Sequence, residues 1–166
     1  MATPTTLPAT FVSGAVLTAA QMNDLRGAFR VLQVVVEQTT TSTTSSTNSY
    51  IATTLIGTIT PTSTSSRILI TVTHSNCFKS SANAANRMDM QLFKNGLYFA
   101  TIATNMAYDG LANEGAFPIV YQTVDSPNTV SAVTYDTGFR NPNNTAEVAV
   151  QRFSTASTIC LMEIST

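Results

Sequence analysis

The chain has 166 residues, of which 43% are hydrophobic and only 10% are charged, and its formal net charge is −1. That length allows one domain with a modest core plus an appendage, and the hydrophobic content excludes a disordered chain. With 8 Lys and Arg against 9 Asp and Glu, and no basic cluster, the sequence lacks the electrostatic footprint of a nucleic-acid-binding protein.

Serine and threonine replace the missing charge and make up roughly a quarter of the chain, well above ordinary usage. Threonine is β-branched and suits a half-exposed pleated surface. A polar surface with little charge does not repel copies of itself, and few charges need to be desolvated when copies meet. The composition therefore favours a β protein that assembles.

The chain begins with a segment that we expect to be an extended arm, residues 1–17. Pro4 and Pro8 prevent a regular helix there. The first ten residues lack the basic start and apolar run of a signal peptide, and no segment of about 20 apolar residues follows. We therefore expect synthesis in a cytoplasm and no membrane partner.

A helix is predicted over residues 19–32, because Thr18 and Gln21 form a capping-box pattern at its start. Its apolar residues follow at spacings of three, four and three, an a/d stripe formed by Met22, Leu25, Phe29 and Leu32. So short a helix is marginal alone in water, and Gly27 costs about 1 kcal/mol relative to alanine. The stripe therefore packs either on the chain's own domain or in a three-helix seam between copies.

Residues 33–37 change to β character, and residues 38–49 are a low-complexity polar stretch, either a flexible linker or a β-edge loop. From Tyr50 onward apolar residues alternate with polar ones, as in half-buried strands. We therefore divide the chain into an arm and helix, 1–37, and a β domain, 38–166. The predicted strands are 50–60, 67–74, 87–94, 97–103, 118–124, 129–137, 145–153 and 158–164.

Turn residues join these strands. Asn95 and Gly96 give the strongest hairpin signal, because both residues tolerate positive φ. Eight or more short strands linked by turns predict an all-β sandwich or jelly roll rather than an α/β fold. Residues 75–86 and 104–117 are predicted to be long loops at one or both ends of the sandwich.

The sequence contains no motif that predicts a cofactor, a metal site or catalysis. None of the seven glycines forms a phosphate-binding loop, and the single histidine, His74, cannot build a histidine-rich metal site. A catalytic pair of His74 and Cys77 needs a third orienting group, so a strand-end histidine is the favoured interpretation. Asp109 and Glu114 share a loop and are the candidates for a cation or a hydrolase, without supporting spacing.

The remaining cysteine and the aromatic residues are also interpreted structurally. We expect Cys160 to be a small buried apolar group, unpaired because a reducing cytoplasm disfavours disulfides. Aromatic residues are scattered through the β region, and core or subunit-interface positions are favoured for them over a sugar-binding face.

Two stretches resemble known families. Residues 10–25 (TFVSGAVLTAAQMNDL) resemble a short N-terminal motif of many tailed-phage and prophage virion proteins. The motif is carried here by Phe11, Gly14, Leu17, Thr18, Ala19, Ala20, Met22, Asn23 and Leu25. Residues 125–135 and 157–164 resemble jelly-roll domains of phage decoration and fibre proteins, in which a DSP turn precedes a strand ending in Thr-Tyr and the last strand reads Ser-x-Ile-x-x-Met-Glu.

The resemblance implies a virion protein made in a bacterial host, with a trimeric, tumour-necrosis-factor-like sandwich and no catalytic residue. The leading hypothesis is a capsid decoration, cement or head-fibre protein that binds the major capsid protein or another virion protein. One alternative is a tail-fibre or receptor-binding module whose loops 75–86 and 104–117 contact host surface glycan. A third, disfavoured, is an envelope-polysaccharide hydrolase. The predicted interface residues are Phe11, Met22, Leu25, Phe29 and Leu32.

Overall fold

The computed structural model describes residues 14, 16, 18, 19, 30–144 and 146–165. Most of the helix predicted over 19–32 lies outside these residues. Four of the predicted interface residues also lie outside them: Phe11, Met22, Leu25 and Phe29. These assignments therefore remain predictions.

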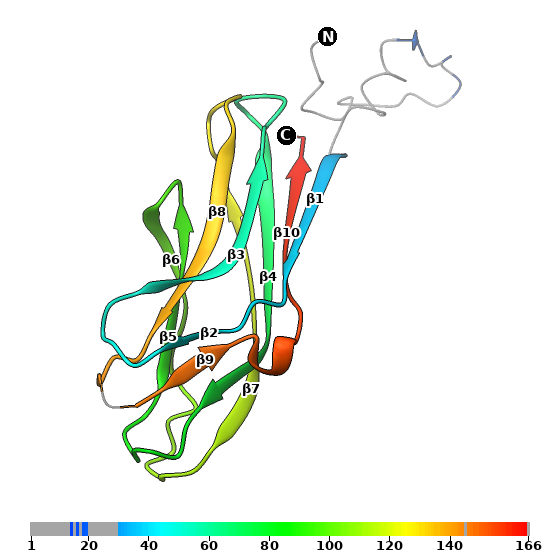
Figure 1. Cartoon of the computed structure of the whole chain (residues 1–166). Helices are drawn as coiled ribbons and strands as arrows, with labels where there is room; N and C mark the ends of the chain where they lie inside the picture. Colours follow the sequence, from blue (N-terminus) through cyan, green and yellow to red (C-terminus); the bar gives the residue numbers. More distant parts are fainter. Residues whose placement is uncertain (1–13, 15, 17, 20–29, 145, 166) are drawn as a thin grey trace.

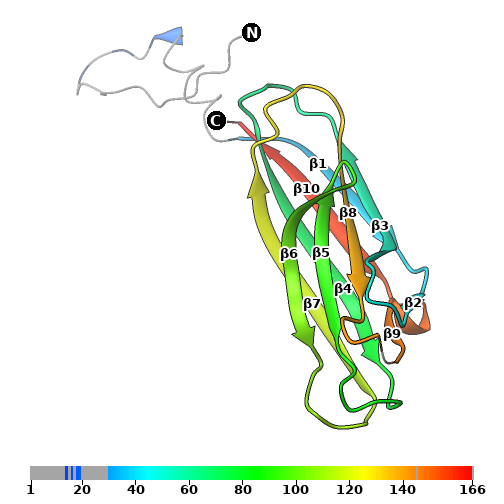
Figure 2. The same ribbon diagram turned by 90° about the vertical axis from the view of Figure 1, so that its left-hand side faces the viewer.

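The described chain forms two antiparallel sheets that pack face to face (Figures 1 and 2). Sheet A contains β1 (Val31–Thr39), β10 (Ser157–Ile164), β4 (Arg67–Lys79) and β7 (Gly115–Asp125), hydrogen-bonded in that order, with the short strands β9 (Val148–Val150) and β2 (Thr43–Ser45) continuing from β4. Sheet B contains β3 (Ile51–Ile59), β8 (Val133–Arg140), β5 (Met88–Lys94) and β6 (Leu97–Met106), in that order.

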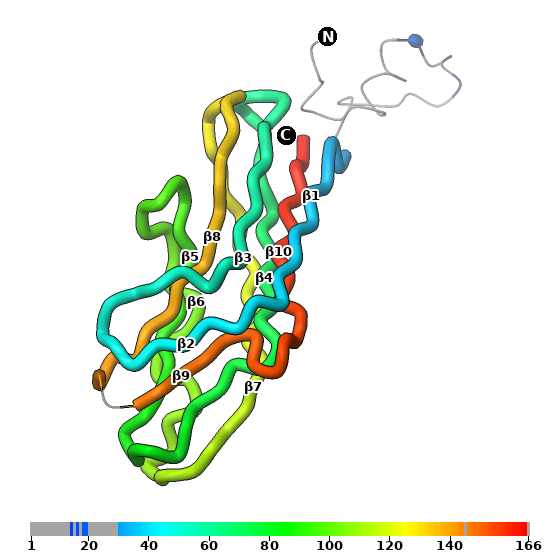
Figure 3. Tube along the Cα trace, in the orientation of Figure 1, coloured from blue at the N-terminus to red at the C-terminus, as the bar shows by residue number. Residues whose placement is uncertain are grey.

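The strand order is that of a jelly roll. Neighbours in the sheets, such as β1 with β10 and β8 with β5, are far apart in the sequence, and the chain crosses between the sheets several times. In Figure 3, β2 and β9 run side by side beneath β1 and β10, and the 3₁₀ turn η1 (Arg152–Ser154) links β9 to β10. The all-β sandwich predicted from the alternation is confirmed.

The core fills the space between the two sheets. Every second residue of β4 is fully buried there: Ile68, Ile70 and Val72. They pack with Leu92 and Tyr135 of sheet B. A second cluster, around Met88, Met90 and Phe139, fills the other end of the sandwich. The inward faces predicted for residues 67–74 and 87–94 are confirmed.

The start of the β domain differs from the prediction. β1 begins at Val31, so Val31 and Leu32 belong to a strand and not to the predicted helix. The strand pairs with β10 from Val31 opposite Ile164 to Thr39 opposite Ser157. The domain boundary drawn at residue 37 therefore falls inside β1. The hydrogen bonds between the nine-residue strand β1 and β10, which is distant in the sequence, outweigh the local preference for a helix.

Other boundaries also move. β4 extends to Lys79, β6 ends at Met106 and β7 begins at Gly115, so the two predicted loops shrink to residues 80–87 and 107–114. β8 covers Val133–Arg140 instead of 129–137. β9 ends at Val150, because Gln151, Phe153 and Ser154 take left-handed backbone angles that stop the strand.

Different segments of the chain lie at the two ends of the sandwich. The start of β1 and the end of β10 lie together at one end, where the Arg30 amide donates to Ser165 Oγ and the Ser165 amide donates to the Arg30 carbonyl, both at 2.9 Å. Loops 80–87 and 107–114 lie at the opposite end (Figures 1 and 2). Within the described residues, no helix has the length and apolar character needed to cross a bilayer.

Candidate assembly interface

The surface of sheet A that faces away from sheet B carries a continuous apolar row. Residues 68, 70 and 72 of β4 and residues 159 and 161 of β10 point into the core, so the residues between them point outward. The register places Val34 opposite Met162, Met162 opposite Leu69, and Leu69 opposite Val124. One apolar row therefore crosses all four long strands.

The next two rows are uncharged as well. Val36, Cys160, Thr71 and Gln122 form the second row, and Thr158, Thr73 and Val120 form the third. These eleven residues are called the sheet A outer face below. Charge appears at its end, where Arg67 lies opposite Ile164.

Several side chains of this face are open to solvent, including Val36 at 61% and Val120 at 69% of full exposure. Monomeric soluble proteins rarely leave a contiguous apolar patch of this kind uncovered, because each square ångström of apolar surface in water costs about 25 cal/mol. The sheet A outer face therefore has the character of a contact surface.

Leu32 is the one predicted interface residue that the structure describes. It is half-buried on β1, two residues before Val34. The residues of the sheet A outer face were not among the predicted interface residues. Their signal was present in residues 34–36 and 158–164, where apolar side chains occupy both faces of a strand, as in strands covered on both sides.

Cys160 lies on this face and is half-buried, not in the core as expected. Cys77 is buried inside the sandwich, and both thiols are free. The prediction that the two cysteines do not form a disulfide is confirmed.

A second exposed apolar group occupies the turn before β10. Phe153 is 82% exposed and has φ 57°, and its neighbours Gln151 and Ser154 also have positive φ. The Arg152 guanidinium lies 3.8 Å from the ring centre of Phe78 and 5.5 Å from that of Phe153. Non-glycine residues with left-handed backbone angles are strained, and such residues cluster at functional sites. This turn is therefore a candidate contact point.

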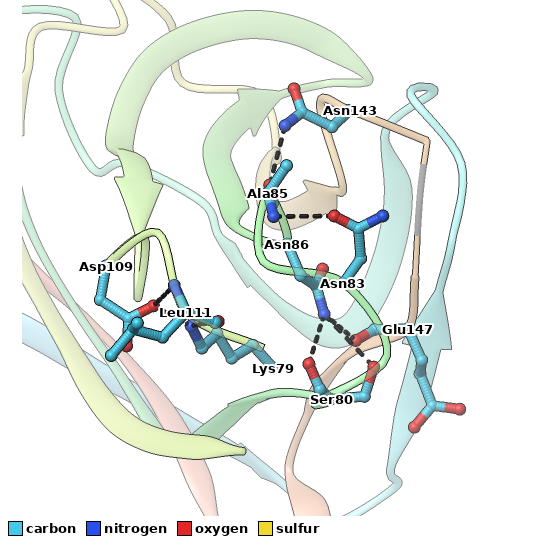
Figure 4. Close-up of polar contacts among 9 residues, drawn as sticks. All are labelled: Lys79, Ser80, Asn83, Ala85, Asn86, Asp109, Leu111, Asn143 and Glu147. Carbon is cyan, nitrogen blue, oxygen red and sulfur yellow. Dashed lines mark hydrogen bonds and ion pairs between the residues drawn. The ribbon is translucent and has the colours of Figure 1, made fainter. Parts of the chain in front are cut away.

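Buried asparagines hold the loops at the far end of the sandwich (Figure 4). Asn86 Nδ2 donates to the carbonyls of Ser80, at 3.0 Å, and Glu147, at 2.9 Å. Asn141 Nδ2 donates to Asn86 Oδ1 at 2.8 Å and to the Ala146 carbonyl at 2.6 Å. Loop 80–87 is thereby fixed to the connection between β8 and β9.

The loop 107–114 is held by a lysine. Lys79 is almost fully buried, and its Nζ donates to Asp109 Oδ1 at 2.5 Å and to the Leu111 carbonyl at 3.2 Å (Figure 4). The hydrogen bond from Lys79, together with that from the Leu111 amide, lowers the pKa of Asp109 to about 2. Asp109 is therefore an ionised structural partner in this loop.

His74 is buried between the sheets with both ring nitrogens hydrogen-bonded. Nε2 lies 3.0 Å from Thr137 Oγ1, and Nδ1 lies 2.9 Å from Gln151 Nε2. Burial lowers the pKa of His74 to about 4 and raises the pKa of Cys77 to about 12. The imidazole is therefore neutral and the thiol protonated near neutral pH, a state unsuited to a reactive pair.

Over residues 30–144 and 146–165, no group of three or more His, Cys, Asp or Glu side chains is arranged to hold a metal ion. Asp109 bonds to Lys79, and Glu114 is exposed on the same loop.

No protein-family model and no curated protein matches the chain. Among solved structures, it is similar to dimeric latent PorU from Porphyromonas gingivalis, with 15% identity and a TM-score of 0.45 over 82% of this chain and 13% of that chain. It is similar to the infectious bursal disease virus VP2 subviral particle, with 12% identity and a TM-score of 0.45 over 81% of this chain and 33% of that one.

A third similar structure is a chain of the cyanophage Pam1 capsid asymmetric unit, with 16% identity and a TM-score of 0.34 over 96% of this chain and 99% of that chain. The chain spans well under half of the first two proteins. Two of the three structures come from viral particles, but similarities this low carry no argument about function.

Proposed function

We propose that this chain is a non-enzymatic structural protein of a bacteriophage particle, and that it assembles as a homotrimer through the sheet A outer face. The observation that carries the proposal is the uncharged row formed by Val34, Met162, Leu69 and Val124 across four strands. The reason for proposing a bacteriophage particle is the resemblance of residues 10–25 to a virion attachment motif.

A second copy of the chain is the partner that best fits this face. A charged partner gains nothing from a surface without charge, whereas an uncharged apolar face is complementary to itself. Interfaces of obligate homo-oligomers are large, about 2,000 Å² or more, and more apolar than the rest of the surface. The three-fold symmetry comes from the resemblance to trimeric jelly rolls.

The place where the arm joins the sandwich supports a decoration, cement or head-fibre role. Arg30, just before β1, lies beside Ser165 at the end of β10, and the asparagine-held loops lie at the opposite end. With the arm on the major capsid protein or another virion protein, the loops face away from the particle. Such a protein strengthens a shell by adding buried area between its neighbours and by no chemical step.

Val36→Asp tests the assembly. Val36 is exposed in the single chain, so the domain tolerates a carboxylate there, but burying it in an interface costs several kcal/mol. Val130→Asp is the matched control, because Val130 is 54% exposed and lies in the connection before β8, outside the sheet A outer face. By analytical ultracentrifugation we expect a trimer for the wild type and for Val130→Asp, and a folded monomer for Val36→Asp.

The native cysteines give an independent readout. Cys160 lies on the sheet A outer face, and Cys77 is buried in the core. A thiol reagent is expected to label Cys160 slowly in the assembled protein and at least tenfold faster in Val36→Asp, with Cys77 unlabelled in both. A wild-type monomer, or Cys160 labelling that Val36→Asp leaves unchanged, contradicts assembly through this face.

A tail-fibre or receptor-binding module is the second candidate. It is favoured by the exposed side chains of Tyr108 and Leu111 on loop 107–114, where the Arg87 guanidinium stacks 5.2 Å from the Tyr108 ring centre. Antibody labelling of purified particles distinguishes the two: label over the head supports decoration, and label confined to the tail supports the fibre.

The absence of enzymatic activity is part of the proposal. The hydrolase alternative depends on Asp109 and Glu114, and Asp109 is already engaged by Lys79. We expect purified protein to release no reducing sugar from host capsule or peptidoglycan. Turnover that Asp109→Ala or Glu114→Ala abolishes would contradict this.

A further inference from the structure

The outer surface of sheet B differs from that of sheet A, because it carries aromatic and charged side chains. A shallow hollow of about 190 Å³ lies on it between the start of β3, the end of β5 and β8. The residues that line it include Tyr50, Phe93, Asp136 and Gly138.

The Phe93 ring lies directly over Gly138. A Cβ atom at residue 138 would stand 2.8 Å from Phe93 Cε2, so only glycine leaves room for the ring. Tyr50 meets Phe93 edge-on, with 6.1 Å between ring centres and 73° between planes. Tyr50 is itself covered by Arg140, whose guanidinium lies 4.6 Å from its ring centre. The two rings are therefore held in place before any ligand arrives.

Asp136 supplies an acceptor without a partner. Its neighbours across the strands are Ile56 and Phe93, both apolar. Among the described residues none donates a hydrogen bond to its carboxylate or forms an ion pair with it. Burial raises the pKa of this carboxyl group above its usual value.

The cations near the hollow are already committed elsewhere. Arg140 donates to Asp89 Oδ2 from Nη2, at 3.0 Å, and from Nε, at 3.1 Å. Lys94 pairs with Asp125 at 2.6 Å. Asp136 is therefore left to accept hydrogen bonds from a ligand, and neither of these two cations is free to attract an anionic one.

We propose that this hollow binds a neutral sugar ring of a polysaccharide, with one apolar face of the sugar on Phe93 and two adjacent hydroxyl groups donating to Asp136. A pyranose presents C–H groups on its faces and hydroxyl donors around its edge, which matches an aromatic ring beside a carboxylate. The carboxylate repels sialic and uronic acids. The inference goes beyond the proposed function, because sheet B is separate from the sheet A outer face and stays accessible when sheet A is covered.

Saturation-transfer difference NMR on the assembled wild-type protein tests the proposal. The probes are the methyl glycosides of glucose, galactose, mannose and N-acetylglucosamine, with N-acetylneuraminic acid as the anionic comparison. At least one neutral glycoside is expected to bind at millimolar concentration, with its strongest signals on one ring face, and N-acetylneuraminic acid is expected not to bind.

Two variants assign the site. Asp136→Asn keeps the shape of the side chain and removes its charge, and Phe93→Ala removes the platform; each is expected to weaken binding at least tenfold. Tyr108→Ala is the matched control, because Tyr108 is an aromatic residue that is 53% exposed on loop 107–114 and does not line the hollow. Circular dichroism shows whether Phe93→Ala folds. If it does not fold, the binding measured for Asp136→Asn alone tests the site.

Three results overturn the proposal: no neutral glycoside binds the wild type, Asp136→Asn binds as tightly as the wild type, or Tyr108→Ala loses binding as well. The sedimentation of Val36→Asp is measured separately. Failure of the sugar-binding proposal can therefore be distinguished from failure of the trimer proposal.

Discussion

His74 lies between the two sheets with Thr137 on one side of its ring and Gln151 on the other. Gln151 Nε2 also donates to Ser157 Oγ, and Thr137 contacts Thr53, so a buried polar chain joins sheet A to sheet B. A protonated imidazole cannot accept the hydrogen bond from Gln151, which is why the neutral form fits this place.

The first prediction is acid sensitivity set by His74. Its pKa falls from 6.5 to about 4 on folding, so the unfolded chain binds more protons between these pH values. The contribution of His74 to the free energy of unfolding therefore has its full value above pH 6.5. It decreases by about 3 kcal/mol as the pH falls to 4. Urea unfolding at fixed protein concentration, at pH 7.5 and pH 4.5, measures the difference.

His74→Gln is the comparison, since it keeps a polar group and removes the titration. Its stability is expected to change much less between the two pH values. An equal acid dependence in the variant and the wild type would show that other groups cause it.

At the scale of single elements, the spacing of the sheets depends on a glycine of β3. A Cβ atom at Gly57 would lie 3.1 Å from Ile159 Cγ2 and 3.2 Å from Leu161 Cδ1. We expect Gly57→Val to reduce the free energy of unfolding by about 1–3 kcal/mol through overpacking. Gly115→Val is the control, because a Cβ there meets only the flexible Lys79 side chain at 3.7 Å. Denaturant midpoints that are equal for both variants contradict the prediction.

Loop 107–114 gives the next prediction. The pKa of Asp109 is lowered in the folded protein, so its contact with Lys79 is present above pH 3.8 and is lost as the pH falls toward 2. Asp109→Asn is expected to speed amide hydrogen exchange in residues 107–114 and to leave assembly unchanged. Glu147→Gln, which breaks the surface ion pair with Arg152, serves as the control. Exchange that stays as slow as in the wild type contradicts the assigned role of Asp109.

The sequence predicted those elements whose pattern is local. Residues 67–74 and 87–94 alternate because one face of each strand is buried, and that alternation is visible in a single segment. β1 was partly missed, because an apolar spacing typical of a helix runs up to Leu32 and only pairing with β10 decides the conformation. The end of β9 was missed because its left-handed residues, unlike those of most such turns, are not glycines.

The sequence signals the sheet A outer face only in part, through the apolar residues on both faces of 34–36 and 158–164. Val34, Leu69, Val124 and Met162 form a row only through the register of β1, β10, β4 and β7. Lys79 shows the same effect, since a lysine near a strand end is expected in solvent and is buried here by a loop 30 residues away.

At the scale of the whole molecule, the predicted roles divide among the arm, the sheet A outer face and the loops. Phe29→Asp is expected to abolish attachment to particles, because it places a carboxylate in the predicted a/d stripe, while the unfolding midpoint of the β domain stays unchanged. Val130→Asp is the control, since Val130 is 54% exposed and lies in the β domain, outside the stripe and the attachment motif. Co-sedimentation with particles that lack the protein measures attachment, and a Phe29→Asp protein that binds like the wild type rules out the stripe as a docking surface.

The reciprocal hydrogen bonds between Arg30 and Ser165 have a mechanical consequence. Just beyond them, Gln33 Nε2 donates to the buried Glu163, which also accepts from the Thr62 amide. A tension applied to the arm along the strand axis would load β1 in shear against β10, so the ladder bonds from Val31 to Thr39 resist together instead of opening one at a time. The pairing of β1 with β10 therefore resists force best along the strand axis, the direction in which a tethered domain is pulled.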